Sequence, residues 1–295
     1  MKETQKLDFA IIGVQKSAST TLQHWLQKHP SLFLLDGEKA CFETPDFERN
    51  QVKYPLDFSK AEKNALLGIK RPKILHDATA LYRLKMHAPE IKVIIILRDP
   101  VDRFISAYFH LMRYSQIPVL DINKSILEMF HGNYLSKFPM SQTLLLYGLY
   151  HPHLEILRGW FNSDRFLILT NKEMKERSLQ TLKRVTDFLG VDPMSVPVGS
   201  DLNVAHYNYN IARVNLLANI FSYKYSAGRL RLEVRRNKLF RKIGSGVSLI
   251  GKNYFKNHLN SNKILTDESL KLLRQYYQND KDSLISSTFK DKVYW

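Results

Sequence analysis

The chain contains one cysteine, Cys41, among its 295 residues. A single thiol cannot form an intrachain disulfide, so the fold must be held by its hydrophobic core, and a reducing compartment is favoured. No run of eighteen apolar residues is present, so the sequence predicts no membrane-spanning helix. The stretch from Met1 to Asp8 lacks the apolar region of a signal peptide. We therefore expect a cytoplasmic protein without integral membrane contact.

Acidic residues are scarce relative to basic ones. The chain has 28 Asp and Glu against 44 Lys and Arg, which gives a formal net charge of +16. Eight cations and a single acid, Glu233, lie between Lys224 and Lys242, with apolar residues between them. Such a run is typical of a solvated basic helix, a membrane-surface helix or a nucleic-acid patch. No RNA-binding aromatic motif or zinc-finger spacing accompanies it, so we favour a solvated helix that helps to attract an anionic cofactor, and expect no nucleic-acid partner.

Apolar runs and helical periodicities alternate along the chain. The pattern predicts strands at 7–13, 92–97 and 165–169, and helices at 20–28, 100–113, 152–161 and 179–189. Thr266 is expected to cap a last helix that has Asp267 and Glu268 in its first turn. Strands separated by helices predict an α/β fold, a central parallel β-sheet flanked by helices, in one domain over 1–295. We expect 195–264 to be an irregular basic segment, and interpret it as an acceptor-side lid.

A loop of small residues follows the first predicted strand. Its sequence from Gly13 is Gly-Val-Gln-Lys-Ser-Ala-Ser-Thr-Thr, and a helix is predicted after it. Small residues and a helix start let backbone N–H groups surround a phosphate, and Lys16 adds a point charge. A nucleotide triphosphatase loop would place glycine at Ala18 and lysine at Ser19. The spacing therefore argues against an ATPase or GTPase.

The loop is similar to the 5′-phosphosulfate loop of sulfotransferases at Gly13, Lys16, Thr20 and Leu22, with Ala18 where that family has glycine. The stretch from Arg98 to Ser106 resembles the family's 3′-phosphate motif, and Gly68-Ile-Lys-Arg-Pro72 resembles a Gly-x-Lys-x-Pro segment of the heparan-type carbohydrate enzymes. The resemblance spans about 7–193 and 265–295, and implies a P-loop-like phosphosulfate-binding loop within the parallel-sheet fold.

The resemblance implies the donor 3′-phosphoadenosine-5′-phosphosulfate, the product adenosine 3′,5′-bisphosphate and no metal. Lys16 would stabilise negative charge on the oxygen that leaves the sulfur. Arg98 and Ser106 would hold the 3′-phosphate. The loop residues expected to surround the 5′-phosphate are Gln15, Lys16, Ser17, Ala18, Ser19, Thr20 and Thr21.

The general base has more than one candidate. Glu38 stands 22 residues after Lys16, the place of the heparan-type catalytic glutamate, although the family's neighbouring histidine is missing. Glu43 is a nearby rival. His76 stands 22 residues before Arg98, the place of the histidine base in small-molecule sulfotransferases. Carboxylate and imidazole both serve as bases near neutral pH. We favour Glu38, with His76 second.

Three classes of function stay open: a sulfotransferase, a kinase-like phosphoryl transferase, and a nucleotide-binding protein without catalysis. We favour the sulfotransferase, acting on a hydroxyl or an amine or guanidine nitrogen of a small molecule, such as a natural-product intermediate. A glycan is the alternative acceptor. Glu43 and Lys70 are candidate acceptor-side residues, and the sequence does not predict the oligomeric state.

Overall fold

The computed structural model describes residues 7–44, 47, 56–194, 208–226, 231–234, 237–254 and 264–289, and the structural statements below concern these ranges. The chain forms two compact units. The first combines Met1–Arg103, Leu149–Val204 and Gln278–Trp295, and the second combines Phe104–Gly148 and Ala205–Tyr277. The chain therefore passes from one unit to the other more than once, and each unit is built from segments distant in sequence.

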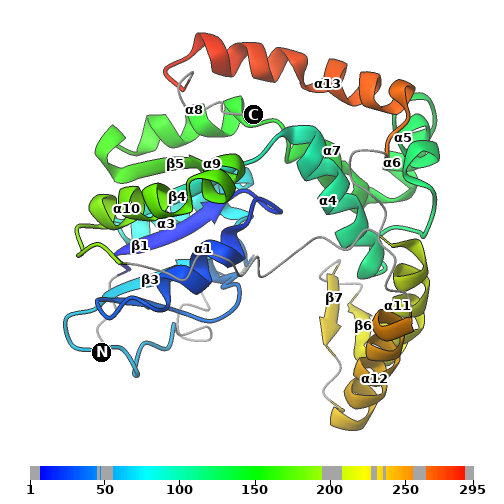
Figure 1. Cartoon of the computed structure of the whole chain (residues 1–295), viewed down its shortest axis with the longest axis horizontal. Helices are drawn as coiled ribbons and strands as arrows, with labels where there is room; N and C mark the ends of the chain where they lie inside the picture. The colour runs from blue at the N-terminus through cyan, green and yellow to red at the C-terminus, as the bar shows by residue number, and fades with distance from the viewer. Residues whose placement is uncertain are drawn as a thin grey trace. The chain divides into compact units, whose positions relative to one another are not determined.

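The first unit is built on a five-stranded sheet in the order β2-β3-β1-β4-β5 (Figure 1). All neighbouring strands pair in parallel. The strands are β1 (Phe9–Gly13), β2 (Leu32–Leu34), β3 (Leu66–Lys70), β4 (Lys92–Leu97) and β5 (Phe166–Thr170). The β-branched run in β4 suits a strand that is covered on both faces. The predicted parallel sheet is confirmed.

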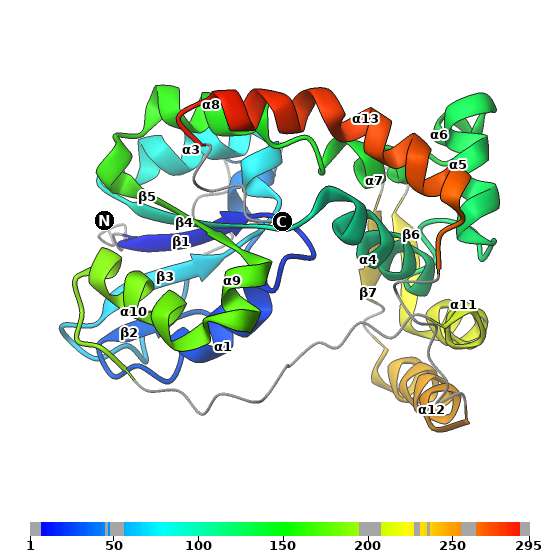
Figure 2. The same cartoon turned by 45° about the horizontal axis from the view of Figure 1, so that its top comes forward.

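Helices cover both faces of this sheet. On one face, Phe9 and Ile11 pack with the apolar sides of α1 (Ser19–Leu26), α9 (Asn171–Glu176) and α10 (Ser178–Leu189). On the other face, Ala10 and Ile12 pack with α3 (Ala78–His87) and α8 (His151–Trp160) (Figure 2). Successive β1 side chains point to opposite faces, so a strand made only of apolar residues is buried on both faces of the sheet. This burial fixes the strand between its neighbours.

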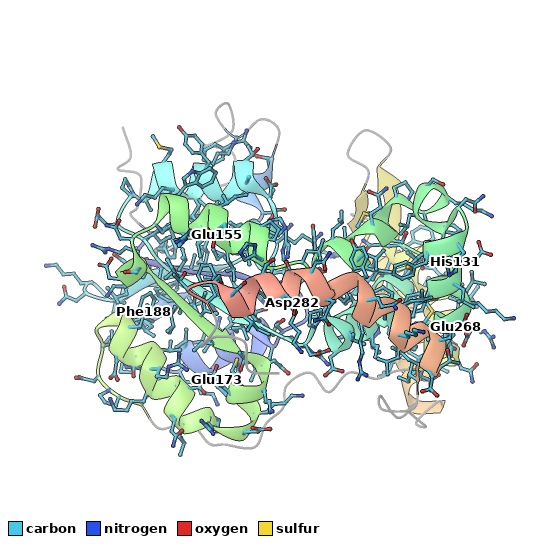
Figure 3. The ribbon with its side chains drawn as sticks, turned by 90° about the horizontal axis from the view of Figure 1, so that it is seen from above. His131, Glu155, Glu173, Phe188, Glu268 and Asp282 are labelled. Carbon is cyan, nitrogen blue, oxygen red and sulfur yellow. The ribbon has the colours of Figure 1, made fainter. Side chains whose placement is uncertain are left out.

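Local signals set the helix ends of this unit. Thr170 and Glu173 form a capping box at the start of α9, and the Glu173 carboxylate also accepts a hydrogen bond from Arg184 at 2.7 Å. Gly190 ends α10 in the left-handed conformation, as a C-terminal glycine commonly does. Figure 3 shows Glu173 on α9 and Phe188 on α10, near that end. These ends agree with the predicted helix at 179–189.

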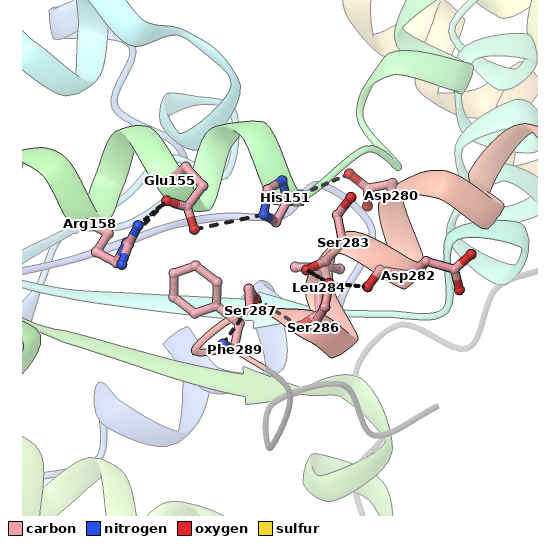
Figure 4. Close-up of polar contacts among 10 residues, drawn as sticks. All are labelled: His151, Glu155, Arg158, Asp280, Asp282, Ser283, Leu284, Ser286, Ser287 and Phe289. Atoms are coloured by element: carbon pink, nitrogen blue, oxygen red, sulfur yellow. Dashed lines mark hydrogen bonds and ion pairs between the residues drawn. The ribbon is translucent and has the colours of Figure 1, made fainter.

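The last helix, α13 (Asp267–Ser286), contributes a cap to α8. Both oxygens of the Asp280 carboxylate accept backbone N–H groups, from Tyr150 and from His151, each at 2.9 Å. Figure 4 shows the contact with His151. A carboxylate at a helix start satisfies donors that have no partner within the helix. Burial nevertheless raises the pKa of Asp280, with these N–H donors opposing the shift. The contact ties a C-terminal segment to the middle of the chain.

The second unit is mainly helical. Its elements are most of α4 (Pro100–Arg113), α5 (Ile122–His131), α6 (Tyr134–Lys137), α7 (Gln142–Leu146), α11 (Tyr209–Ser222), α12 (Lys238–Tyr254), the start of α13, and an antiparallel pair, β6 (Tyr223–Ser226) with β7 (Arg231–Val234). The Tyr108 hydroxyl lies 2.8 Å from the Ser125 hydroxyl and donates to the Leu120 carbonyl at 2.9 Å. These bonds join α4 to the segment that leads into α5.

The segment expected to be irregular, 195–264, is regular where the structure describes it. Residues 195–207, 227–230, 235–236 and 255–263 lie outside the described ranges. The reason for the difference is tertiary packing, because Gly244 and Gly251 of α12 lie against α11 at points where a Cβ would collide with Ser222 and Val214. Glycine lowers helix propensity, and the close packing outweighs that penalty.

The other predicted strands and helices match observed elements to within two residues at each end. These elements are β1, β4, β5, α1, α4, α8, α10 and the start of α13. Strands β2 and β3 were not predicted. The helices of the described ranges include none that is both long and apolar enough to cross a bilayer.

Gly68 of β3 provides a test of the sheet. A Cβ at this position would lie 2.3 Å from the ring of Phe9 on the neighbouring strand, so Gly68→Ala must displace a buried aromatic side chain. We expect it to lower the free energy of unfolding by about 1–3 kcal/mol. The urea midpoint measures this effect.

Gly159→Ala is the matched control, since nothing lies within 4 Å of a Cβ there and the residue is helical. It should be neutral or should stabilise the protein by up to about 1 kcal/mol. Equal midpoints for Gly68→Ala and the wild type would contradict the described packing of β1 on β3.

Candidate functional site

The candidate site lies where β1, β3 and β4 end. The end of β1 and the loop after it are bonded to both neighbouring strands. Val14 donates its N–H to the Ile96 carbonyl of β4 at 2.8 Å, and Arg71, at the end of β3, donates its N–H to Ile11 at 2.8 Å. Ligands of open parallel sheets bind at this edge, because loops of neighbouring strands meet there.

The loop from Val14 to Ala18 turns sharply into α1. Lys16 and Ala18 both have a φ of 72°, in the left-handed region that residues other than glycine rarely adopt. Ala18 is also the N-cap of α1, makes no side-chain cap, and is followed by a first turn without an acidic residue. The start of α1 therefore presents backbone donors and a positive dipole end to a ligand. An anion fits these donors.

The side chains of the loop support the same interpretation. Ser17 is completely buried, and its hydroxyl oxygen has no hydrogen-bond partner among the described residues. A buried hydroxyl without a partner costs about 1–3 kcal/mol, so a ligand that bonds to it restores stability. Ser19 and Thr21 are buried beside it, whereas Thr20 is exposed and Gln15 half-buried. The residues present fit a phosphate group.

Arg98 lies against this loop. Its guanidinium donates from Nη1 to the Lys16 carbonyl at 3.0 Å, and its Nε is buried with no hydrogen-bond partner among the described residues. Asp102 lies 4.0 Å from Nη2, too far for a strong hydrogen bond. The Tyr150 hydroxyl donates to the Arg98 carbonyl at 2.8 Å. The structure thus places the Lys16 loop beside Arg98, at the carboxyl ends of their strands.

Ser106 lies on α4, which begins two residues after Arg98. Its side chain is buried, and it belongs to the second unit. Asp99 holds the start of this helix, because its carboxylate accepts the Asp102 N–H at 2.9 Å. Burial raises the pKa of Asp99, and the N–H donors oppose that shift. The part of Ser106 in ligand binding stays a prediction.

Two carboxylates share one guanidinium at the end of β3. Arg71 contacts Glu38 at 2.7 Å and forms a two-pronged contact with Glu43. The Glu38 loop is itself held in place, because Lys39 donates its N–H to the Lys70 carbonyl at 3.1 Å and the Gln23 amide of α1 donates to the Leu35 carbonyl at 2.7 Å. The structure thus fixes both base candidates of the sequence, Glu38 and Glu43, relative to β3.

Two lysines lie near these carboxylates, Lys70 buried and Lys73 half-buried. Lys70 is 4% exposed and donates from Nζ to the Thr20 hydroxyl of the phosphate loop at 3.0 Å. Burial lowers the pKa of Lys70, and the charge of Glu38 opposes the shift. Burial also lowers the pKa of Lys73, as does the charge of Arg71. Buried cations of this kind favour an anionic ligand.

His76 lies in a short 3₁₀ turn, Ile74–His76, after β3. Its ring packs edge-on against His153 of α8, with 4.7 Å between the ring centroids. Burial lowers the pKa of His153. His76 therefore lies between the sheet end and α8, while Glu38 belongs to the Arg71 cluster, and the described contacts give the two base candidates different surroundings.

Sequence reasoning missed Arg71 and Gln23. Arg71 lies inside the Gly-Ile-Lys-Arg-Pro segment, and this motif could have indicated a functional arginine. Its carboxylate partners come from a loop about 30 residues earlier, which the sequence did not indicate. Gln23 gives no signal, because its role is to bond carbonyl groups of that loop. The described residues contain no group of three or more His, Cys, Asp or Glu arranged to hold a metal. Independence from metal stays a prediction.

Comparison with known proteins places the chain in a family. The model of the sulfotransferase domain matches residues 6–264. The chain is 27% identical over 213 residues to the mouse bifunctional heparan sulfate N-deacetylase/N-sulfotransferase 4, covering 69% of this chain and 23% of that protein. It is 27% identical over 181 residues to the human heparan sulfate glucosamine 3-O-sulfotransferase 6, covering 61% of this chain and 51% of that protein. The chain thus spans about a quarter to a half of these curated relatives.

Among solved structures, the sulfotransferase from Alicyclobacillus acidocaldarius aligns with a TM-score of 0.55 and 21% identity, covering 72% of this chain and 92% of that one. This structural similarity shows that the two proteins share a fold. The match of the family model extends over both the phosphate loop and the Arg98 segment. The chain belongs to the sulfotransferase domain family.

Proposed function

We propose that this protein is a sulfotransferase that uses 3′-phosphoadenosine-5′-phosphosulfate as donor and releases adenosine 3′,5′-bisphosphate. The observation that carries the proposal is the pairing of two phosphate motifs in one place. The Arg98 guanidinium donates to the Lys16 carbonyl at 3.0 Å, while Ser17 Oγ and Arg98 Nε are buried and have no hydrogen-bond partners in the described part of the chain. A nucleotide with two phosphate groups supplies acceptors for both.

Each residue of the loop has a part in this proposal. When bound, the donor supplies the sulfuryl group. Backbone N–H groups at the start of α1 and the Ser17 hydroxyl bind the 5′-phosphate, and Gln15, Ser19, Thr20 and Thr21 surround it. Arg98 binds the 3′-phosphate through its guanidinium, including the Nε that has no partner among the described residues, and Ser106 adds a hydroxyl donor. Lys16 stabilises the charge that grows on the leaving oxygen, so its effect is largest in the transition state.

The acceptor must lose a proton, and we assign its removal to Glu38. Glu38 is the more exposed of the two carboxylates on Arg71, with 38% of its side chain accessible against 18% for Glu43. Both carboxylate oxygens of Glu43 accept hydrogen bonds from Arg71, which suits a residue that positions the guanidinium. His76 is the rival base. We assign Lys70 to the acceptor side, and its bond to Thr20 of the loop supports a position next to the donor.

For the acceptor we propose a hydroxyl or an amine or guanidine nitrogen of a small molecule, such as a natural-product intermediate. A carbohydrate is the second candidate, favoured by the relatives named for heparan sulfate. Sulfur-labelled donor, supplied with either a small-molecule extract or a heparan-type oligosaccharide, separates the two. Label in the oligosaccharide alone would overturn the small-molecule proposal.

Binding of the product nucleotide tests the donor proposal. Adenosine 3′,5′-bisphosphate should raise the melting temperature of the wild type more than ATP does, because it carries the 3′-phosphate that Arg98 binds. Arg98→Ala should weaken bisphosphate binding by about ten- to a hundredfold, and Ser106→Ala should weaken it by less. Isothermal titration calorimetry measures both constants.

Arg158→Ala serves as the control, since this arginine is exposed on α8 and pairs only with a neighbour on the same helix, Glu155, among the contacts described. It should bind the bisphosphate as the wild type does. An unchanged constant in a folded Arg98→Ala variant would remove Arg98 from the 3′-phosphate site, and an ATP preference in the wild type would favour a phosphoryl transferase.

Lys16→Ala should lower kcat far more than it lowers donor affinity, on the order of a hundredfold, because its charge acts mainly in the transition state. Lys16→Arg, which keeps the charge, should recover part of the rate. The measurement is kcat and KM with labelled donor. Unchanged kcat with a raised KM in Lys16→Ala would make this lysine a binding residue only.

Glu38→Gln keeps size and hydrogen bonding but cannot accept a proton at neutral pH. It should lose activity by on the order of a hundredfold or more while bisphosphate binding survives. His76→Ala should be milder. Glu62 is exposed and distant in sequence from Glu38, so Glu62→Gln is the control. If His76→Ala has the larger effect, the base is His76, and if both variants stay active, either Glu43 is the base or the acceptor needs none.

A further inference from the structure

Helix α12 (Lys238–Tyr254) is amphipathic in a way that the catalytic proposal does not use. One side of it packs on α11 (Tyr209–Ser222), and Figures 1 and 2 both show the two helices side by side. Gly244 lies against Ala218 and Ser222, Gly251 lies against Val214, and the Ser248 hydroxyl donates to Asn215 Oδ1 at 2.8 Å. Glycines at this spacing let the two helices approach closely, so α11 supports α12 along most of its length.

The opposite side of α12 exposes large apolar side chains. Leu239 is 66% exposed, Ile243 41% and Ile250 66%. Their spacing of four and seven residues places them on one stripe of a helix, with exposed Gly246 between them. Leu249, beside the stripe, is also exposed. A contiguous apolar stripe on a protein surface marks a binding face more often than a solvated one.

Positive charge lies along one edge of this stripe. Lys238 and Lys242 are exposed and lie along its edge, one turn apart. The sequence from Val234 to Thr266 contains no aspartate or glutamate, while it contains Arg235, Arg236, Lys238, Arg241, Lys242, Lys252, Lys256 and Lys263. A partner that contacts this helix must therefore offer apolar volume against the stripe and negative charge beside the lysine edge.

We propose that the outward face of α12 binds the surface of an anionic lipid bilayer, with Leu239, Ile243 and Ile250 among the acyl chains and Lys238 and Lys242 on lipid phosphates. The helix lies in the plane of the interface, where amphipathic helices with cationic edges bind. Lysines attract anionic leaflets, and each adds roughly a fivefold gain in binding. The enzyme then works on acceptors that lie at, or enter from, a membrane surface.

Two other occupants fit the surface less well. A nucleic acid offers phosphates for the lysines but leaves a stripe of leucine and isoleucine without apolar contact. A second copy of this face would bring like charges together, because every charged residue in the described part of the helix is a cation. An anionic bilayer satisfies both features, which is why we choose it.

Vesicle flotation tests the proposal with the full chain. The protein should float with vesicles of phosphatidylcholine and phosphatidylserine in equal parts, bind vesicles of phosphatidylcholine alone more weakly by on the order of tenfold, and detach from the anionic vesicles as salt is raised. The double variant Leu239→Ser, Ile250→Ser should bind more weakly by on the order of tenfold or more. Lys242→Glu should weaken binding to anionic vesicles only.

Matched controls lie on other helices. Leu179→Ser with Ile285→Ser removes two apolar side chains that are 55% and 48% exposed, and Lys271→Glu reverses an exposed charge on α13. Both should bind as the wild type does, and the melting shift with adenosine 3′,5′-bisphosphate should persist in every variant, which shows that the first unit is folded. Circular dichroism of the α12 variants checks the second unit.

The proposal is overturned if the serine variant binds vesicles as tightly as its control, or if the wild type floats equally with both kinds of vesicle at low and high salt. It is also overturned if the wild type prefers duplex RNA to the anionic vesicles, or if it is a dimer that the serine variant dissociates in sedimentation velocity. Loss of floating confined to the α12 variants supports it, whatever the outcome of the catalytic tests.

Discussion

Parallel pairing of β1 with both β3 and β4 is the constraint on which the first unit depends. Parallel strands end at the same edge, so the loops after Gly13, Lys70 and Leu97 must meet. The Arg98 guanidinium reaches the Lys16 carbonyl, and the Lys70 ammonium reaches Thr20, only because these strands lie next to one another. Without that order, the same residues would be three separate motifs along the chain.

The site is built for negative charge before any ligand is bound. Lys70 is buried, the Arg98 Nε has no acceptor among the described residues, and Ser17 contributes a hydroxyl in the same state. Buried donors and cations destabilise a protein unless something satisfies them. A phosphate nucleotide does so at several atoms at once. The same unsatisfied groups therefore lower the stability of the first unit without ligand and raise its affinity for such a nucleotide.

The Arg71 cluster joins the phosphate edge to the carboxylate candidates. Glu38 and Glu43 share one guanidinium, so neither carboxylate moves independently of β3. Gln23 connects the same loop to α1, which begins at the phosphate loop. A change in the loop after β1 can therefore reach Glu38 through a single helix, and the positions of donor and base are coupled by the packing of α1.

The sequence by itself determined the parallel α/β class and the positions of β1, β4 and β5 and of α1, α4, α8, α10 and the start of α13, because β-branched runs, caps and Gly190 act locally. It also determined the residues of the Lys16 loop and the Arg98 motif, since their spacing from a strand end is a local property. Tertiary structure decided the rest. Short strands β2 and β3 form by pairing with β1, the Arg71 partners come from a distant loop, and α12 is helical because its glycines pack on α11. These features depend on contacts between residues far apart in the chain, and no local pattern encodes such contacts.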